Sequence, residues 1–225
     1  MPITTRTKLT EQLNSIETLL KSYSRKAAGD IRGISEAAKG DKSVAEKVLG
    51  GRKTEDRLRS QLEDTCFDVM LLQQPLIGAD FRFVTGAFRI VSDLSHIDDM
   101  TRDATFLLQE MPQKSIDKFV DEFAQMAEIS ASMVEDSITA FLDSDVEKAQ
   151  VVIETDDKVN SLYGEATDRL VGLIRDGKGS AKYLPELLMV GKYFERIGDL
   201  AKSIADWAIF RSTGAYRGHV LGENE

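Results

Sequence analysis

The sequence is poor in the residues on which secreted proteins, membrane proteins and many metalloenzymes depend. It has one cysteine, two histidines and four prolines in 225 residues. A single cysteine cannot form an intramolecular disulfide, so we expect a reducing compartment. The start of the chain lacks the apolar run of a secretion signal, and no stretch approaches the roughly 20 apolar residues that cross a bilayer. We therefore expect a cytoplasmic protein.

The charge balance disfavours a second group of functions. The chain has 38 acidic and 29 basic residues, which gives a net charge of −9. Phosphate-backbone binding depends on basic surfaces, and anionic lipid headgroups repel an acidic one. We expect no nucleic-acid partner, and membrane association only through partner proteins.

Motifs of common enzyme classes are also missing. The sequence contains no glycine-rich phosphate loop, no GxSxG and no CxxC pair. Di-iron four-helix enzymes need Glu-x-x-His on two helices, and His96 has no glutamate three residues before it. The sequence therefore predicts a protein that is not an enzyme.

Apolar residues recur every three or four positions over long segments, which is typical of helices with one buried face. The first such stripe extends from Leu9 to Ala38, and a second segment, 43–72, has a weak point at Gly50–Gly51. Further helices are predicted over 80–109, over 116–143 and in two segments after that. Strands have little support, so the fold class is all-α.

The two halves of the chain resemble each other. Asp41 aligns with Asp145 at an offset of 104 residues, and Asp99 aligns with Asp199 at an offset of 100. Such self-similarity indicates a repeated structural unit. We predict two tandem three-helix bundles related by pseudo-twofold symmetry, over residues 1–110 and 111–210, followed by a flexible C-terminal tail over residues 211–225.

Oxygen donors recur at helical spacing on two helices of the second unit, namely Asp156, Asn160, Glu195 and Asp199. If these faces meet, the space between them favours a cation, because unpaired buried charges are unstable. Gly198 would allow the close approach. Oxygen ligands favour Mg²⁺, Mn²⁺, Ca²⁺ or oxidised iron. Alternatively, Arg196 and Lys202 could neutralise the cluster without a metal.

The corresponding positions of the first unit form a weaker site. They hold Arg52, Asp56, Ser95, Asp99 and Asp103. A hydroxyl and a cation here replace two of the acidic or amide groups, so fewer oxygen ligands remain.

Four motifs give the chain a resemblance to the PhoU family: QQPLIGADFRFV from Gln73, DLSHIDD from Asp93, ETDDKVN from Glu154 and FERIGDLAKSIADW from Phe194. The resemblance implies tandem three-helix bundles and a cytoplasmic accessory role in bacterial high-affinity phosphate uptake. It implies a negative regulator that works between the phosphate ABC transporter's ATPase and a membrane sensor histidine kinase. We also expect a homodimer, and we regard Asp80–Arg82 as a candidate contact point.

Some members of that family hold metal ions at Glu-x-x-x-Asp motifs, which implies a divalent or trivalent ion such as Mg, Mn or Fe. The motif maps onto Glu195 and Asp199 with Asp156 and Asn160, and the first copy onto Asp99, Asp103 and Asp56. The chain departs from the family pattern at Arg52, Ser95, His96, Asp98 and Ser203. Two alternatives remain open, a metal-dependent enzyme or metal store, and an accessory protein of a low-affinity phosphate carrier.

Overall fold

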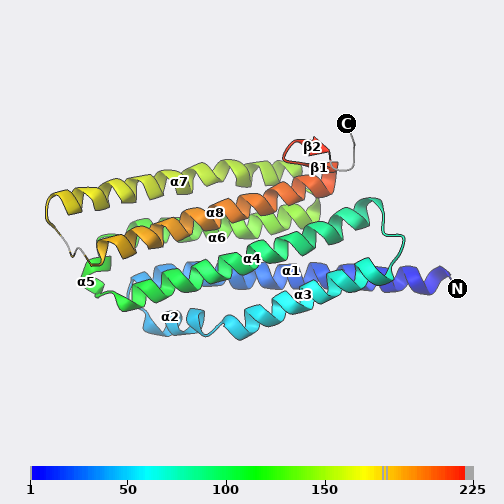
Figure 1. The fold of residues 1–225 in the computed structure, drawn as a ribbon, viewed down its shortest axis with the longest axis horizontal. Coiled ribbons are helices and arrows are strands. Elements are labelled where there is room, and N and C mark those ends of the chain that lie inside the picture. Colours follow the sequence, from blue (N-terminus) through cyan, green and yellow to red (C-terminus); the bar gives the residue numbers. More distant parts are fainter. Residues whose placement is uncertain (1, 179, 181, 221–225) are drawn as a thin grey trace.

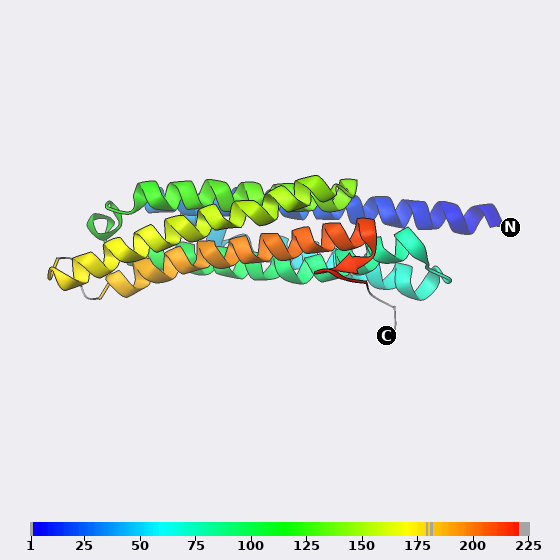
Figure 2. The same ribbon diagram turned by 90° about the horizontal axis from the view of Figure 1, so that it is seen from above.

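The computed structural model describes residues 2–178, 180 and 182–220. This part of the chain is mainly helical, and its long helices lie side by side in an elongated bundle (Figures 1 and 2). In chain order the elements are α1 (Pro2–Ala38), α2 (Lys42–Leu49), α3 (Arg52–Leu72), α4 (Gly78–Glu110), α5 (Gln113–Ile116), α6 (Val120–Asp143), α7 (Val146–Arg175), α8 (Leu184–Thr213), β1 (Ala215–Tyr216) and β2 (His219–Val220). The all-α prediction is confirmed. None of the described helices is long and apolar enough to cross a membrane.

The first unit consists of α1, the α2–α3 pair and α4. The predicted stripe on α1 is buried from Ile16 to Ala38. The second predicted helix, with its weak point at Gly50–Gly51, is two helices that meet there. A Cβ on Gly51 would lie 2.6 Å from both Lys26 Nζ and Glu55 Oε1. The absence of a side chain at this position therefore makes room for an ion pair.

The second unit repeats this arrangement with α6, α7 and α8, which pack on one another. The single turn α5 precedes it, so the predicted fourth helix is interrupted between Ile116 and Val120. Helix α7 is continuous, unlike its counterpart α2–α3. Glu154 and Thr155 stand where the first unit has its pair of glycines, so nothing weakens the helix at that point.

Equivalent aspartates precede the middle helices of the two units. Asp41 accepts hydrogen bonds from the backbone N–H groups of Ser43 at 3.0 Å and Val44 at 3.2 Å. Asp145 accepts one from the backbone N–H of Lys148 at 2.9 Å. Both aspartates are N-caps, which satisfy N–H groups that the first helical turn leaves unpaired. The sequence alignment of these two positions thus corresponds to the same local structure.

The two units pack along their length, α1 against α6 and α4 against α8. Their buried apolar side chains form one continuous cluster. Phe83 stacks on Phe141 with ring centroids 5.6 Å apart, and a Cβ on Gly86 would lie 2.7 Å from the Phe141 ring. Arg211 lies over both rings and donates a hydrogen bond to the carbonyl oxygen of Leu142 at 2.7 Å. Helix α4 ends at the predicted boundary between the units, yet the core crosses it.

The C-terminal region differs from the tail predicted from residue 211. Helix α8 extends past this point, and β1 then pairs antiparallel with β2. The ring of Tyr216 stacks on Trp207 with centroids 4.3 Å apart. This contact holds the hairpin against α8. Residues 221–225 of the predicted tail lie outside the described residues.

Candidate functional site

The facing sides of α7 and α8 bring together the oxygen donors predicted for the second unit. Asp156 is 1% exposed, and its Oδ2 accepts hydrogen bonds from Asn160 Nδ2 at 3.1 Å and from Lys202 Nζ at 2.9 Å. A Cβ on Gly198 would lie 2.8 Å from Asp156 Oδ1. The prediction that this glycine allows close approach of the two helices is therefore confirmed.

Glu195 and Asp199 extend this cluster along α8. Glu195 Oε2 lies 2.6 Å from Lys192 Nζ. Partial desolvation raises the pKa of Asp199, and the nearby charges of Glu195 and Asp156 raise it further. The hydrogen bond to Asp156 raises the pKa of Lys202. The cluster therefore contains the four predicted residues together with two lysines.

The positive charge in this cluster comes from the chain itself. Lys202 contacts the buried carboxylate directly, whereas Arg196, the other cation considered from the sequence, is exposed. Asp156 Oδ1 has no hydrogen-bond partner among the described residues. In residues 2–178, 180 and 182–220, no group of three or more His, Cys, Asp or Glu side chains is placed to hold a metal ion. The side chains as placed therefore do not form a metal site, and the predicted metal binding is not tested by this geometry alone.

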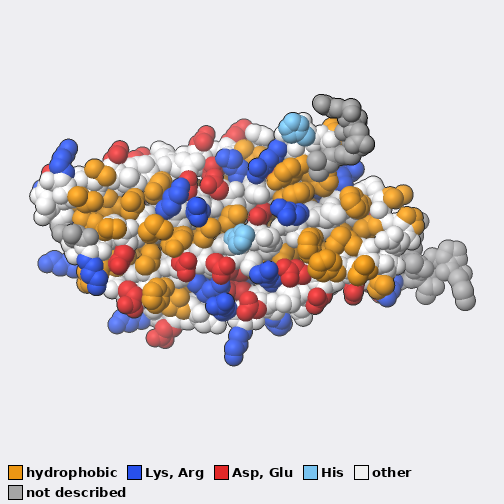
Figure 3. Space-filling model, in the orientation of Figure 1, with side chains coloured by type: hydrophobic (Ala, Val, Ile, Leu, Met, Phe, Trp, Pro, Cys, Tyr) orange, Lys and Arg blue, Asp and Glu red, His pale blue; other side chains and the backbone are white. Residues whose placement is uncertain are grey.

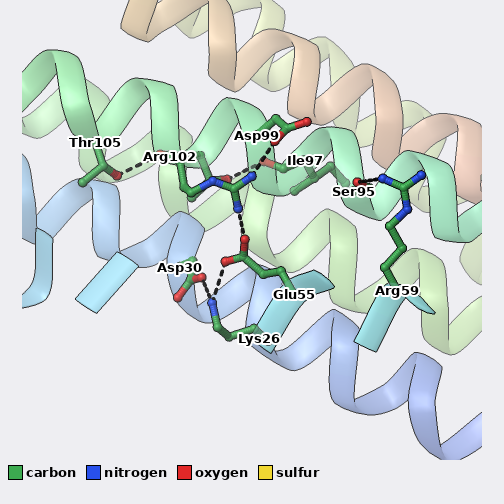
Figure 4. Close-up of polar contacts among 10 residues, drawn as sticks. Lys26, Asp30, Glu55, Arg59, Ser95, Ile97, Asp99, Arg102 and Thr105 are labelled. Atoms are coloured by element: carbon green, nitrogen blue, oxygen red, sulfur yellow. Dashed lines mark hydrogen bonds and ion pairs between the residues drawn. The ribbon is translucent and has the colours of Figure 1, made fainter. Parts of the chain in front are cut away.

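In the first unit, α1, α3 and α4 meet at a partly buried ion-pair network (Figure 4). Lys26 Nζ lies 2.9 Å from Glu55 Oε1 and also pairs with Asp30. Arg102 pairs with the same glutamate from α4 and with Asp99 on its own helix. The Glu55 side chain is 4% exposed, so its charge depends on these two cations. Of this network, the sequence predicted Asp99 alone as a site residue.

A polar cavity of about 90 Å³ lies beside the network, and the predicted ligands Asp56 and Asp99 line it together with Ser95. Asp103 is placed elsewhere, because its Oδ2 accepts a hydrogen bond from the Tyr193 hydroxyl at 3.4 Å, across the contact between α4 and α8. The structure thus brings two of the three predicted first-unit ligands to one cavity and separates the third.

Asp98 forms part of the cavity wall and is 3% exposed. The Tyr23 hydroxyl lies near this carboxyl, although no contact to either oxygen among the described residues reaches full hydrogen-bond geometry. Burial raises the pKa of Asp98 to about 7, although the Tyr23 hydroxyl and the charge of Lys26 act in the opposite direction. At neutral pH this carboxyl is therefore divided between its protonated and ionised forms.

Arg102 and Asp98 were not identified as site residues from the sequence, although the internal repeat points to both. At the offset of 100, Arg102 takes the place of Lys202. Each pairs with a buried carboxylate on the middle helix of its unit, Glu55 on α3 and Asp156 on α7. Asp98 takes the place of Gly198. The first unit therefore has an additional buried carboxylate where the second has no side chain.

Comparison with known proteins gives a family and named relatives. The model of the PhoU domain matches residues 123–208. The chain is 34% identical over 175 residues to the phosphate-specific transport system accessory protein PhoU homolog of Aquifex aeolicus, with 76% of this chain and 77% of that protein covered. It is 28% identical over 176 residues to the homolog of the same name in Clostridium acetobutylicum, with 78% and 80% covered.

Two solved structures share the fold. The phosphate transport system regulatory protein PhoU from Streptococcus pneumoniae superposes with a TM-score of 0.79 at 21% identity, covering 94% of this chain and 98% of that one. PhoU from Pseudomonas aeruginosa gives a TM-score of 0.74 at 19% identity, with 96% and 100% covered. The domain match and the identity to the Aquifex protein show that the chain belongs to the PhoU family.

Proposed function

We propose that the protein is a non-enzymatic cytoplasmic regulator of phosphate uptake. It links the ATPase subunit of a phosphate ABC transporter to a sensor histidine kinase, and it keeps the phosphate-starvation response off while phosphate is plentiful. Family membership carries this proposal, since the relatives named above are accessory proteins of phosphate-specific transport.

Exposed apolar side chains near opposite ends of the bundle support an adaptor with two partners (Figures 1 and 3). The α3–α4 end surface consists of Phe67, Leu71, Leu72, Ile77 and Phe81. The α7–α8 end surface consists of Val171, Ile174 and Met189. Charged side chains are prominent in the middle of the face that Figure 3 shows. Grouped exposed apolar residues are typical of protein contacts, so each end offers a surface for one partner.

The segment Asp80–Arg82, considered from the sequence as a contact point, lies at the α3–α4 end surface. Phe81 is exposed there. Arg82 instead donates a hydrogen bond from its Nε to the backbone carbonyl oxygen of Arg211 at 2.9 Å, which joins α4 to α8. In this segment, Phe81 is therefore the apolar side chain available to a partner.

Signal transfer requires the adaptor to prefer one conformation of the transporter or the kinase. A difference of about 1–3 kcal/mol in binding free energy between the two conformations is sufficient. The continuous core joins both units along their length. The two end surfaces therefore belong to one body, so partners held at both ends are kept in a defined relative position.

The proposal is tested by deleting the gene in its host and measuring a phosphate-scavenging reporter in phosphate-rich medium. We expect the reporter to switch on in the deletion strain and to switch off again when the wild-type chain is supplied. Continued repression in the deletion strain would contradict the regulatory role.

A further inference from the structure

We propose that Lys202 and Arg102 are built-in counter-cations, each in the place where a metal ion would otherwise neutralise the acidic cluster of its unit. Both residues lie on the last helix of a unit, at equivalent positions of the repeat. Each pairs with a buried carboxylate of the middle helix. The folded protein therefore needs no metal at either cluster.

In the second unit, the contacts around Asp156 neutralise its buried charge through one oxygen, Oδ2, while Oδ1 has no hydrogen-bond partner among the described residues. Its Oδ2 accepts one hydrogen bond from the ammonium group of Lys202 and one from the side-chain amide of Asn160. Because the amide presents its N–H group to this carboxylate, its oxygen is turned away from the carboxylate. Asn160 could bind a metal only through that oxygen. The orientation of Asn160 therefore suits an internal ion pair.

A metal ion at this position would have to displace an ammonium group. Lys202 Nζ lies 2.9 Å from Asp156 Oδ2, and a second lysine, Lys192, pairs with Glu195 in the same cluster. The ammonium group of Lys202 and a metal ion bound to the same carboxylate would repel each other strongly, because the site is partly desolvated. Lys202 thus excludes a cation from the Asp156 carboxylate while it occupies that position.

The first unit has the same kind of internal ion pair, with two cations on one buried carboxylate. Arg102 pairs with Glu55 and Asp99, and Lys26 pairs with Glu55 and Asp30 (Figure 4). Here the buried carboxylate has two cationic partners. The departures from the family pattern in the first unit are thus accompanied by an internal ion-pair network around Glu55.

The Lys202 side chain is 40% exposed, so its replacement should disturb the packing of the bundle little. We would titrate Mn²⁺ into metal-free wild-type protein and into Lys202→Met by isothermal titration calorimetry. The wild type should show no Mn²⁺ site that depends on Asp156. Lys202→Met should gain such a site, with an Mn²⁺ affinity at least about tenfold above any binding to the wild type, because a like charge next to the ligand oxygen is gone. The double variant Lys202→Met, Asp156→Asn should lose this gain.

Two matched variants separate the effect from general charge loss. Lys202→Arg keeps the charge and should behave as the wild type. Lys158→Met removes an exposed lysine from α7 and should not create a site. An affinity for Mn²⁺ that is equal in the wild type and in Lys202→Met would overturn the proposal.

A measurement on the unmodified protein decides the matter even if Lys202→Met fails to fold. Elemental analysis and thermal unfolding of gently purified wild type, before and after chelation, should show no bound metal and an unchanged Tm. Stoichiometric metal whose removal lowers the Tm would refute the proposal. In the first unit, metal-free Arg102→Met should likewise bind Mn²⁺ more tightly than the wild type does.

Discussion

Replacing Asp98 by asparagine should stabilise the protein at alkaline pH and much less at acidic pH. The carboxyl is 3% exposed, and burial raises its pKa from 3.8 to about 7. The folded state therefore holds this proton more tightly than the unfolded state does. The stability that comes from protonated Asp98 is fully present below pH 4 and is lost as the pH rises through 7.

The magnitude follows from the two pKa values. Each unit of pKa difference corresponds to about 1.4 kcal/mol, so ionised Asp98 lowers the free energy of unfolding by about 4 kcal/mol at pH 8. At pH 5 the loss is about 1.6 kcal/mol, because the folded carboxyl is mostly protonated there. The amide introduced by Asp98→Asn has no charge to desolvate, so this variant should gain clearly more stability at pH 8 than at pH 5.

Urea unfolding of the wild type and of Asp98→Asn at pH 5 and pH 8 measures this difference directly. Asp64→Asn on the exposed face of α3 is the control, and its effect should be small and similar at both pH values. An equal gain at both pH values, or destabilisation of Asp98→Asn at pH 8, would refute the reasoning about its buried charge.

Two glycine substitutions test the close contacts inside and between the units. Gly198→Ala should lower the free energy of unfolding by about 1–3 kcal/mol, since its Cβ would lie 2.8 Å from a carboxylate oxygen of Asp156. Gly86→Ala should have an effect of similar size, since its Cβ would lie 2.7 Å from the Phe141 ring. Gly29→Ala on α1 meets nothing within 4 Å and should be neutral or stabilise by up to about 1 kcal/mol. Chemical denaturation compares the three, and equal effects would contradict the packing described.

Features of the fold that depend on nearby residues could be predicted from the sequence. The apolar stripe of α1 and the caps Asp41 and Asp145 follow from spacing and local chemistry. The sequence did not predict the hairpin after α8, because its two strands are too short to show an apolar period. It is held in place by the contact of Tyr216 with Trp207 on α8.

The candidate site was predictable only where its residues lie one helical turn apart. Asp156, Asn160 and the Glu195–Asp199 pair have that spacing, and Gly198 gave the reason for their close approach. The Glu55 network draws on three helices, so no fixed sequence spacing links its members. Of its two cations, Arg102 was recognisable by comparing the two units position by position, because it takes the place of Lys202, whereas Lys26 was not.

The central claim, an adaptor with one partner at each end, is tested most directly by co-purification from phosphate-replete host cells. The tagged wild-type chain should retain both the transporter ATPase and the sensor kinase. Leu71→Ser with Ile77→Ser should lose one of them, and Val171→Ser with Ile174→Ser should lose the other. Val151→Ser, similarly exposed but near the start of α7 at the other end of this helix, should keep both. Retention of both partners by both double variants, or of neither by the wild type, would contradict the account.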